Sequence, residues 1–478
     1  MMMEEMKEMR KKMNRKTSGQ YNREMMDFIE QNPTSFHVIA GQQKQLEEAG
    51  YTQLSESEAW EIQPGGKHFV IRSGSAIAAF RIPENSTGTA GFMIMASHSD
   101  SPALKVKQNP EIKADQAYTK LNVEPYGGLL MAPWFDRPLS AAGRIFVKTG
   151  DGDSAGLKCL LVNVDRDLLV IPSLAVHMNR EANKGYAYNA QKDLLPLYGT
   201  VESRPLAELA AEAAGVSQED ILDMDLYLYN RQPGTVFGAD KEFLMSPRLD
   251  DVQCAYASLQ GFLESDQESA DTGVDASLKN TVGTEKASVP VHIVFDNEEV
   301  GSSTRQGAAS TFLADTLERI SEALGDTRTA YKQRIANSFM LSADNAHAVH
   351  PNHVDKADPV NHPHLNGGIV LKYSANQRYT TDAMSASIVR LLAERAGLTL
   401  QEFHNRSDIP GGSTLGNISG NQVPVCTADI GIAQLAMHSP CETCGTEDTE
   451  QMVTLARELF ASGIRVGEGG VVVFHTGR

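Results

Sequence analysis

Several apolar runs in this chain end abruptly in polar residues. The runs GFMIMAS, VPVHIVF and NSFMLSA have the length and composition of buried strands. In the second half of the chain, such runs alternate with segments of helical periodicity, of which RLLAERAG and EQMVTLARELFASGI are the clearest. Alternating strands and helices predict an α/β fold in three layers, α/β/α, with helices on both faces of one sheet.

The middle of the chain has a different texture. Between residues 101 and 245 the sequence consists of short β-like pieces, such as GRIFVK and LKCLLVNV, separated by turns that contain Gly and Pro. We expect this stretch to be a β-rich unit inserted into the larger fold. The α/β part would then comprise residues 1–100 and 246–478.

Two further segments stand out by their polarity. Residues 1–17 carry charges throughout and lack the apolar core of a signal peptide, so we expect a flexible tail ahead of helical sequence over 18–54. Residues 265–287 are poor in large apolar side chains and predict a surface loop.

Composition narrows the functional class. With 478 residues the chain is long enough for two or three domains, and no run of 18 apolar residues predicts a membrane span. A formal net charge of -18 argues against nucleic-acid phosphates as the partner. Five cysteines in so long a chain fit a reducing compartment, so we expect a cytoplasmic protein.

Metal-ligand residue types follow the predicted strands. One apolar run leads into His98 and Asp100, another into Glu298 and Glu299, and two further runs end in Asp344 and His438. Ligands of open α/β sheets bind outside the carboxyl ends of the strands, so these side chains are expected at one rim. A fifth candidate is Asp250 or Asp251, in the segment SPRLDD.

A charge count indicates two divalent cations at this rim. Two zinc ions carry four positive charges, which the carboxylates of Asp250, Glu299 and Asp344 and one bridging hydroxide would balance. Glu298 is then free to act as a general base towards a water molecule whose pKa zinc lowers to roughly 7. Asp100, two residues after His98, suits the role of orienting the imidazole of that histidine.

Other hydrolytic designs lack their signatures. The chain contains no HExxH and no GxSxG with the spacing of a nucleophile elbow. The residues alone are compatible with any dinuclear hydrolase, including a deacetylase or a carboxypeptidase-like enzyme, and with a scaffold protein that kept the fold. The scaffold reading is disfavoured because no candidate ligand or base is missing.

The chain resembles the family of aspartyl aminopeptidases and the vacuolar aminopeptidase I, which are dinuclear zinc exopeptidases. The resemblance runs in order from about residue 90 to 440 and therefore covers nearly the whole chain. It rests on the segments ASHSDSPALKVK, EPYGG, DRPLSAAGR, VHMNR, SPRLDD, DNEEVGS, SADNAHAVHPN, NQRYTTD, IPGGSTLG and QLAMHS.

The resemblance implies a role for each matching residue in the release of N-terminal residues from peptides. His98 and Asp344 would hold one zinc ion, Glu299 and His438 the other, and Asp250, the acid directly after SPRL, would bridge both. Glu298 would be the base and Asp100 would orient His98. Cobalt or manganese could replace zinc at one site, because borderline ligand sets accept several metals.

The resemblance also implies that residues 101–245 form a lid and dimerisation domain. His177, in VHMNR, would reach the active site of a neighbouring subunit and stabilise an oxyanion there. Relatives assemble from dimers into dodecamers, so a homo-oligomer is expected.

Substrate preference is the least constrained expectation. His347, Lys372 and Tyr379 match positions near the substrate, and a lysine there would pair with an acidic N-terminal side chain. We therefore expect a preference for Asp or Glu at the N-terminus. Relatives that favour Leu and other neutral residues share much of this framework, so a neutral preference is the alternative. The chain also departs from the usual family pattern at Asp251, where relatives often carry Asn.

Overall fold

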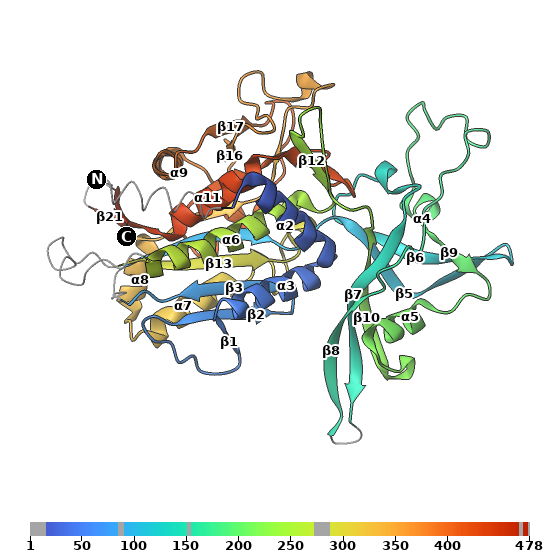
Figure 1. The fold of residues 1–478 in the computed structure, drawn as a ribbon, viewed down its shortest axis with the longest axis horizontal. Coiled ribbons are helices and arrows are strands. Elements are labelled where there is room, and N and C mark those ends of the chain that lie inside the picture. The colour runs from blue at the N-terminus through green and yellow to red at the C-terminus, as the bar shows by residue number, and fades with distance from the viewer. Residues whose placement is uncertain (1–15, 85–89, 151–153, 272–286, 468–471, 477–478) are drawn as a thin grey trace.

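The computed structural model describes residues 16–84, 90–150, 154–271, 287–467 and 472–476. Figure 1 shows two parts: a body, in which helices pack on a large sheet, and an arm, which projects from one side of the body and is built mainly of strands. The chain crosses into the arm after β4 and returns after β10, so the body is formed by segments from both ends of the sequence.

The body is organised around a nine-stranded sheet with the order β1-β2-β3-β13-β4-β14-β18-β16-β17. Its strands are β1 (Thr52–Leu54), β2 (Lys67–Arg72), β3 (Ala76–Arg81), β4 (Phe92–His98), β13 (Val289–Phe295), β14 (Phe339–Ala343), β16 (Ile369–Tyr373), β17 (Leu400–His404) and β18 (Cys426–Gly431).

The middle of this sheet is parallel. Strand β4 pairs in parallel with β13 on one side and β14 on the other, and β14 pairs in parallel with β18. In this register Phe295 at the end of β13 lies beside His98 at the end of β4. The residues that follow β4, β13 and β14 therefore emerge at the same edge of the sheet, as the sequence pattern predicts.

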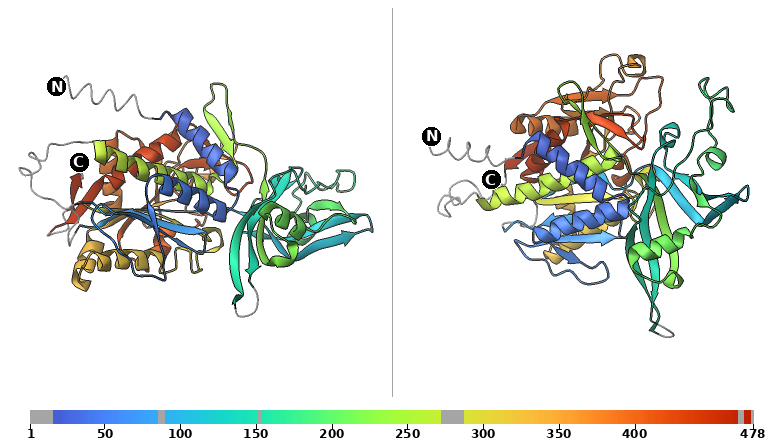
Figure 2. Two further views of the ribbon diagram at one scale, coloured as in Figure 1. Left: turned by 60° about the horizontal axis from the view of Figure 1, so that its bottom comes forward. Right: turned by 45° about the vertical axis from the view of Figure 1, so that its right-hand side comes forward.

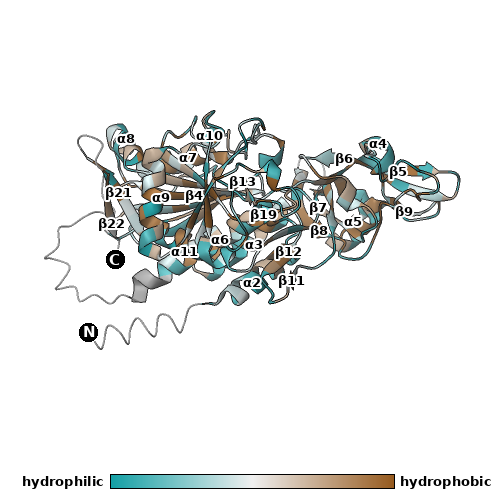
Figure 3. Cartoon of the chain, turned by 90° about the horizontal axis from the view of Figure 1, so that it is seen from above, coloured by the Kyte–Doolittle hydropathy of each residue, from teal (hydrophilic) through white to brown (hydrophobic). Residues whose placement is uncertain are grey.

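Helices cover both faces of the sheet. Alternate side chains of β4 belong to different cores: Met93 and Met95 pack under α2, α3, α6, α9 and α11, whereas Phe92 and Ile94 pack under α7, α8 and α10. Figure 3 shows the apolar strands between these helical layers. The three-layer α/β/α prediction is confirmed. The helices are α2 (Ser18–Gln31), α3 (Ser35–Glu48), α6 (Leu249–Asp271), α7 (Phe312–Ala323), α8 (Arg328–Ala336), α9 (Ala383–Ala396), α10 (Leu415–Ser419) and α11 (Asp448–Phe460).

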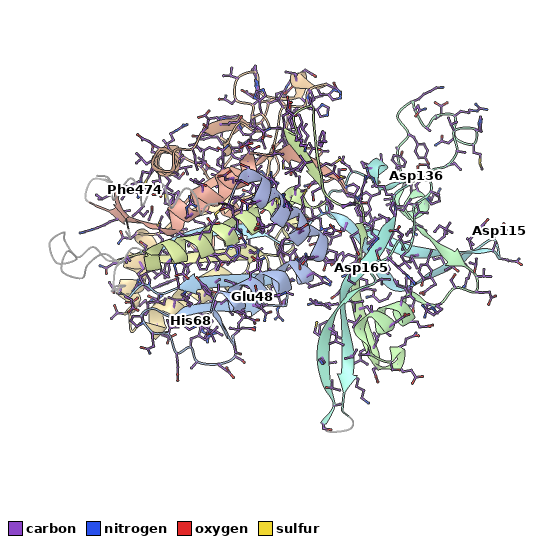
Figure 4. All side chains as sticks on the ribbon, in the orientation of Figure 1. Glu48, His68, Asp115, Asp136, Asp165 and Phe474 are labelled. Atoms are coloured by element: carbon purple, nitrogen blue, oxygen red, sulfur yellow. The ribbon has the colours of Figure 1, made fainter. Side chains whose placement is uncertain are left out.

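The arm is a six-stranded sheet with the order β8-β7-β10-β5-β6-β9 and a hydrophobic core of its own. Figure 4 labels Asp165 near its base and Asp115 at its far tip. Its elements are β5 (Ala103–Ala114), β6 (Tyr118–Tyr126), β7 (Leu139–Thr149), β8 (Gly156–Asn163), α4 (Ala190–Asp193), β9 (Leu197–Thr200), α5 (Leu206–Ala214) and β10 (Ile221–Asn230).

Two smaller sheets complete the body. A five-stranded sheet contains β11 (Thr235–Phe237), β12 (Phe243–Ser246), β15 (Ala346–His347), β19 (Ala433–Leu435) and β20 (Glu442–Gly445), and β21 (Ser462–Val466) pairs with β22 (Val472–Thr476). The chain leaves the arm at the end of β10, at Asn230, and rejoins the body through β12, which pairs with β20. The domain limit at 245 stays a prediction.

Two polar segments of the sequence lie largely outside the described ranges. Helix α6 continues to Asp271, so the loop expected at 265–287 begins later than predicted, and residues 272–286 are not among those described. Residues 1–15 of the expected tail are likewise outside them, while Thr17 caps α2 by accepting from the backbone N–H of Gln20. Within the described residues, no helix is long and apolar enough to cross a membrane.

Candidate metal centre

The candidate ligands meet at the carboxyl edge of the nine-stranded sheet. His98 is the last residue of β4, Asp344 directly follows β14, and Glu298 and Glu299 form the short helical turn η4 (Glu298–Val300) after β13. His438 follows β19. Parallel strands deliver the first four residues to one edge, which is why an apolar run followed by an acid or histidine located them correctly.

Asp250 lies between the two histidines. Its Oδ1 is 3.6 Å from His98 Nε2 and its Oδ2 is 3.4 Å from His438 Nε2. It stands at the start of α6, where its backbone is not yet helical and the carboxylate is free to turn towards the sheet edge. Each oxygen of one carboxylate thus faces a different imidazole.

The remaining acids divide between the same two histidines. Asp344 Oδ1 lies 4.0 Å from His98 Nε2, and Glu299 Oε2 lies 3.3 Å from His438 Nε2. Three overlapping groups of donor atoms lie within 4.8 Å of one another: His98–Asp250–Asp251–Asp344, His98–Glu298–Glu299 and Asp250–Glu299–His438. Spacings of this kind allow one cation to contact all members of a group.

Several carboxylate oxygens in this cluster lack hydrogen-bond partners. Within the described part of the chain, Asp250 Oδ1, Asp251 Oδ1 and Glu299 Oε1 are buried and accept no hydrogen bond. A buried carboxylate oxygen without a partner lowers the folding stability by several kcal/mol, unless a cation or a proton binds to it. The donor set therefore fits divalent cations, and the orphaned oxygens are the direct sign of that fit.

Burial and mutual repulsion shift the titration of this cluster. Burial raises the pKa of Glu298 to about 8, with Asp344 adding to the effect, and raises the pKa of Glu299 well above its usual range. Burial acts in the same direction on Asp250, but the facing imidazoles of His438 and His98 keep the pKa of that carboxyl well below its usual range. The cluster thus holds more negative charge than its protein neighbours neutralise.

Asp100 organises the loop beside the cluster. Its Oδ1 and Oδ2 accept the backbone N–H groups of Glu298 and Glu299, each at 3.1 Å, and Oδ2 also accepts the hydroxyl of Tyr126 at 2.7 Å. The Nδ1 of His98 lies 3.0 Å from the carbonyl oxygen of Asp100 and 3.4 Å from its Oδ1. A donor at Nδ1 leaves Nε2 free as an acceptor, which is the tautomer that a metal-binding imidazole requires.

Sequence reasoning missed Glu442. This buried carboxylate accepts the backbone N–H of Asp250 at 2.9 Å and the backbone N–H of His438 at 2.7 Å. Burial raises its pKa to about 8. The only signal in the sequence is an acid in the segment PCETCG after QLAMHS, and nothing there predicts that its oxygens fix two candidate ligands.

The arm also reaches the cluster. The carbonyl of Gly128, just after β6, lies 3.1 Å from Nδ1 of His438, and the N–H of Leu130 donates to the carbonyl of His438 at 3.0 Å. Gly127 has φ +74°, and a Cβ there would lie 3.1 Å from Cβ of Glu299. The segment EPYGG is therefore a close backbone contact between the arm and two candidate ligands.

Three of the candidate substrate residues lie near Asp344. Lys372 on β16 is only 2% exposed, donates from Nζ to the carbonyl of Asn345 at 2.9 Å and lies 3.4 Å from Asp344 Oδ2. Its ammonium is 5.5 Å from the ring centroid of Tyr379. The ring centroids of His347 and Tyr379 each lie 6.1 Å from that of Phe403. The candidate substrate residues Lys372, His347 and Tyr379 therefore lie on the same side of the cluster.

His177 is placed elsewhere in the protomer. It is exposed in the segment between β8 and α4, which projects from the arm away from the body (Figure 2). Among the described residues, no hydrogen bond or ion pair joins His177 to the cluster. Its predicted role in a neighbouring subunit's site stays a prediction.

A carboxyl edge that gathers histidines and acids with unpaired oxygens is the mark of a metal-binding protein. Comparison with known proteins narrows the class. A model of the family described as aminopeptidase I zinc metalloprotease (M18) matches residues 28–460. Probable M18 family aminopeptidases 2 from Clostridium novyi and Clostridium acetobutylicum are 39% and 41% identical over 93% and 91% of this chain, and over 99% and 96% of their own lengths.

Solved structures agree. A cryo-EM structure of the Ape4 and Nbr1 complex matches with a TM-score of 0.85 at 34% identity, covering 93% of this chain and 86% of that one. The structure of the S. cerevisiae mApe1 dodecamer matches with a TM-score of 0.78 at 30% identity, covering 92% and 95%. The chain belongs to the M18 family of zinc aminopeptidases and is a metalloprotease of the hydrolase class.

Proposed function

We propose that the protein removes N-terminal residues from peptides with two zinc ions per chain, bridged by Asp250. The observation that carries the proposal is that each oxygen of Asp250 faces a different histidine. Asp344 and His98 would complete one site and Glu299 and His438 the other. When bound, the two ions would polarise the scissile carbonyl and lower the pKa of a water molecule between them to about 7.

Glu298 is the proposed general base. Its carboxylate belongs to the donor group that includes His98 and Glu299, so it reaches the same space without sharing the Asp250 contacts. The backbone N–H of Glu298 donates to Asp100, which holds the residue in place. The Glu298 carboxylate would take a proton from the attacking water and pass it to the leaving amine. Asp100 would position His98 and the Glu298 backbone together.

An acidic N-terminal residue is the proposed preference. Lys372 would attract the carboxylate of such a side chain, with His347 and Tyr379 beside it. The specific observation that favours the alternative, a neutral Leu-type preference, is that Lys372 is buried and already contacts Asn345 and Asp344. In that case Lys372 only positions Asp344.

Assembly into a homo-oligomer is proposed as well. Exposed apolar side chains surround His177, namely Leu174, Val176, Met178, Tyr186 and Tyr188. A patch of this kind on an arm fits burial against another copy of the chain. The mApe1 dodecamer supports an assembly of the same kind, built from dimers in which His177 would enter the partner's site.

The substrate test uses Asp-, Glu-, Leu- and Lys-aminoacyl substrates, each with a free or acetylated α-amine, with zinc and with added cobalt or manganese. We expect hydrolysis of free amines only, fastest for Asp and Glu. Equal cleavage of acetylated peptides would refute the aminopeptidase assignment, and a clear Leu preference would leave the chemistry intact while removing Lys372 from substrate recognition.

The role of His177 is tested by mixing inactive variants. His177→Ala and Glu298→Gln would each be inactive alone, but a mixed dimer regains one complete site, with Glu298 from one chain and His177 from the other. We expect activity to return after co-refolding of the two variants. No recovery, with mixed oligomers verified by mass, would contradict action across the interface.

A further inference from the structure

A cavity lies where the arm joins the body, which we call the seam cavity. The empty space between its lining atoms, counted together with its opening to solvent, is about 640 Å³. It is bounded by the link between α2 and α3 at Thr34 and Ser35, by the end of β10 at Tyr229, and by Arg248. None of these residues belongs to the proposed ligand set, although Asp100 and Glu442, which position proposed ligands, also line the cavity.

Arg248 brings an unpaired positive charge to this cavity. Its Nη2 donates to the carbonyl of Ile29 at 2.6 Å, and its Nε is buried without an acceptor. No described carboxylate lies within ion-pair distance of the guanidinium. A buried guanidinium with open donors is costly unless an anion meets it.

Two further donors face the same space. Trp134 lines the cavity, is 2% exposed, and its Nε1–H has no acceptor among the described residues. Helix α3, 14 residues long, begins at Ser35, and its N-cap Thr34 makes no capping hydrogen bond because its hydroxyl pairs with Nδ1 of His37. The first N–H groups and the positive end of the helix dipole therefore remain available for an anion.

The acids that line the cavity are engaged elsewhere. Asp100 accepts from Tyr126 and from the N–H groups of η4, and Glu442 accepts from the N–H groups of Asp250 and His438. Both carboxylates thus turn towards the metal centre. The buried donors Arg248 Nε and Trp134 Nε1 are left without acceptors at this cavity, which favours a ligand that accepts.

Part of the wall is apolar. The rings of Tyr126 and Tyr227 lie edge to face, 5.5 Å apart, and Tyr229 and several prolines add apolar surface beside the polar lining residues. Inorganic ions would leave this surface without contacts, whereas an organic ligand would bury it.

From this arrangement we infer that the seam cavity binds a small organic carboxylate, with its anionic group between Arg248 and the N-terminus of α3 and its apolar body against the aromatic walls. The inference goes beyond the proposed peptidase activity and does not depend on it. A ligand there contacts both the arm and the body, so its occupancy would favour one arrangement of the two parts.

The test uses benzoate as the probe, measured by calorimetry on the zinc-loaded full chain. We expect one benzoate per chain, with affinity at least about tenfold weaker for benzamide, which lacks the charge, and for sulfate, which lacks the ring. Arg248→Met should weaken benzoate binding by about tenfold or more, and Arg248→Lys by less. Trp134 is one of two tryptophans, so its fluorescence in a Trp60→Phe background should respond to benzoate.

The matched control is Arg319→Met. Arg319 also donates to backbone carbonyls, and its guanidinium carbon lies 4.0 Å from the centroid of the Trp60 ring. Its benzoate affinity should equal that of the wild type. Equal affinity for benzamide and benzoate would overturn the inference. So would undiminished binding by a folded Arg248→Met variant, or competition between benzoate and peptide substrate, which would put the probe at the metal centre.

Discussion

The carboxyl edge of the nine-stranded sheet and the base of the arm surround their acids in different ways. In the arm, Asp225 lies 3.0 Å from Lys105 Nζ through one oxygen and 3.0 Å from Arg144 Nε through the other. At the sheet edge, Asp250 and Glu299 each keep a buried oxygen without a hydrogen bond. Both regions contain several charges, but at the sheet edge some buried carboxylate oxygens have no partner among the described residues.

The difference separates a structural charge from a functional one. Burial would raise the pKa of Asp225, yet its ion pairs hold that pKa below the usual range, whereas the pKa of Glu299 is raised by burial and by Asp250. A raised pKa in an acid whose oxygen has no hydrogen-bond partner indicates a cation-binding site. Each prediction below tests whether this contrast holds.

The largest effect is expected from Glu298→Gln. If Glu298 moves the proton, this variant should lose about 10²–10⁴-fold in kcat while it binds two metals per chain, measured by elemental analysis. Glu318→Gln, on the exposed face of α7, is the control and should behave as wild type. Turnover of Glu298→Gln at the wild-type rate would remove Glu298 from the role of base.

Metal removal should destabilise the protein through the sheet edge. Chelation leaves the acids around Asp250 without their cations, so the free energy of unfolding should fall by about 3–4 kcal/mol relative to protein held at 100 to 1,000 times the metal Kd. Denaturant titration with and without chelator measures this. The same difference should persist in Asp225→Asn, because the arm's charges are balanced internally; an identical midpoint with and without metal would contradict the contrast.

His292 extends the contrast to a buried histidine. It lies mid-strand in β13, with Nδ1 2.7 Å from Ser258 Oγ and Nε2 3.1 Å from Gln42 Oε1, and burial lowers its pKa to about 3. The unfolded chain then binds a proton that the folded chain does not, so stability is full above about pH 6.5 and falls by about 1.4 kcal/mol per pH unit down to about pH 3.

Removing this group should flatten the pH dependence. In chelator, His292→Gln should lose that slope between about pH 6.5 and 3, whatever its absolute stability, as followed by denaturant midpoints. His353→Gln, at an exposed histidine, should keep the wild-type slope. Parallel curves for His292→Gln and wild type would mean that His292 is not held neutral.

Gly127→Ala tests the contact between the arm and the edge. The left-handed backbone costs about 1–2 kcal/mol with a side chain, and the added Cβ would push against Glu299. We expect kcat/KM to fall about tenfold. Gly50, at φ +84° with nothing within 4 Å, is the matched control, and Gly50→Ala should lose stability only. Equal activity of the two variants would show that the approach to Glu299 is not critical.

The smallest effect is expected from Asp225→Asn. Loss of the half-exposed ion pairs should lower the free energy of unfolding by about 1 kcal/mol without changing kcat/KM. A large loss of activity would mean that the charges of the arm serve the metal centre directly.

The sequence allowed the fold class and the meeting of the strand ends to be predicted. Apolar runs mark buried strands, and parallel pairing brings the residues after them to one edge, which located His98, Glu298, Glu299 and Asp344. The assignment of Asp250 rather than Asp251 came from family resemblance, because a hydrophobic pattern does not distinguish two adjacent acids. Their geometry differs: Asp250 faces both histidines, and Asp251 accepts the backbone N–H of His98.

What could not be predicted depends on long-range contacts. Glu442 acts through the backbone of Asp250, 192 positions away, and the Gly128–His438 contact joins residues 310 positions apart. No local pattern encodes either. Lys372 was assigned to substrate recognition from its position alone, and its contact with Asp344 became visible only when β14 and β16 were placed in one sheet.

The backbone of the arm contacts His438 at two points: the Gly128 carbonyl lies beside the imidazole, and the Leu130 N–H donates to the backbone carbonyl. A change in how the arm docks must then alter the free energy with which that imidazole binds a metal. Thermodynamic reciprocity requires the converse to the same degree: metal occupancy must alter the docking of the arm, and with it any contact the arm makes with another chain. In the proposed homo-oligomer, metal loading would therefore be coupled to subunit association.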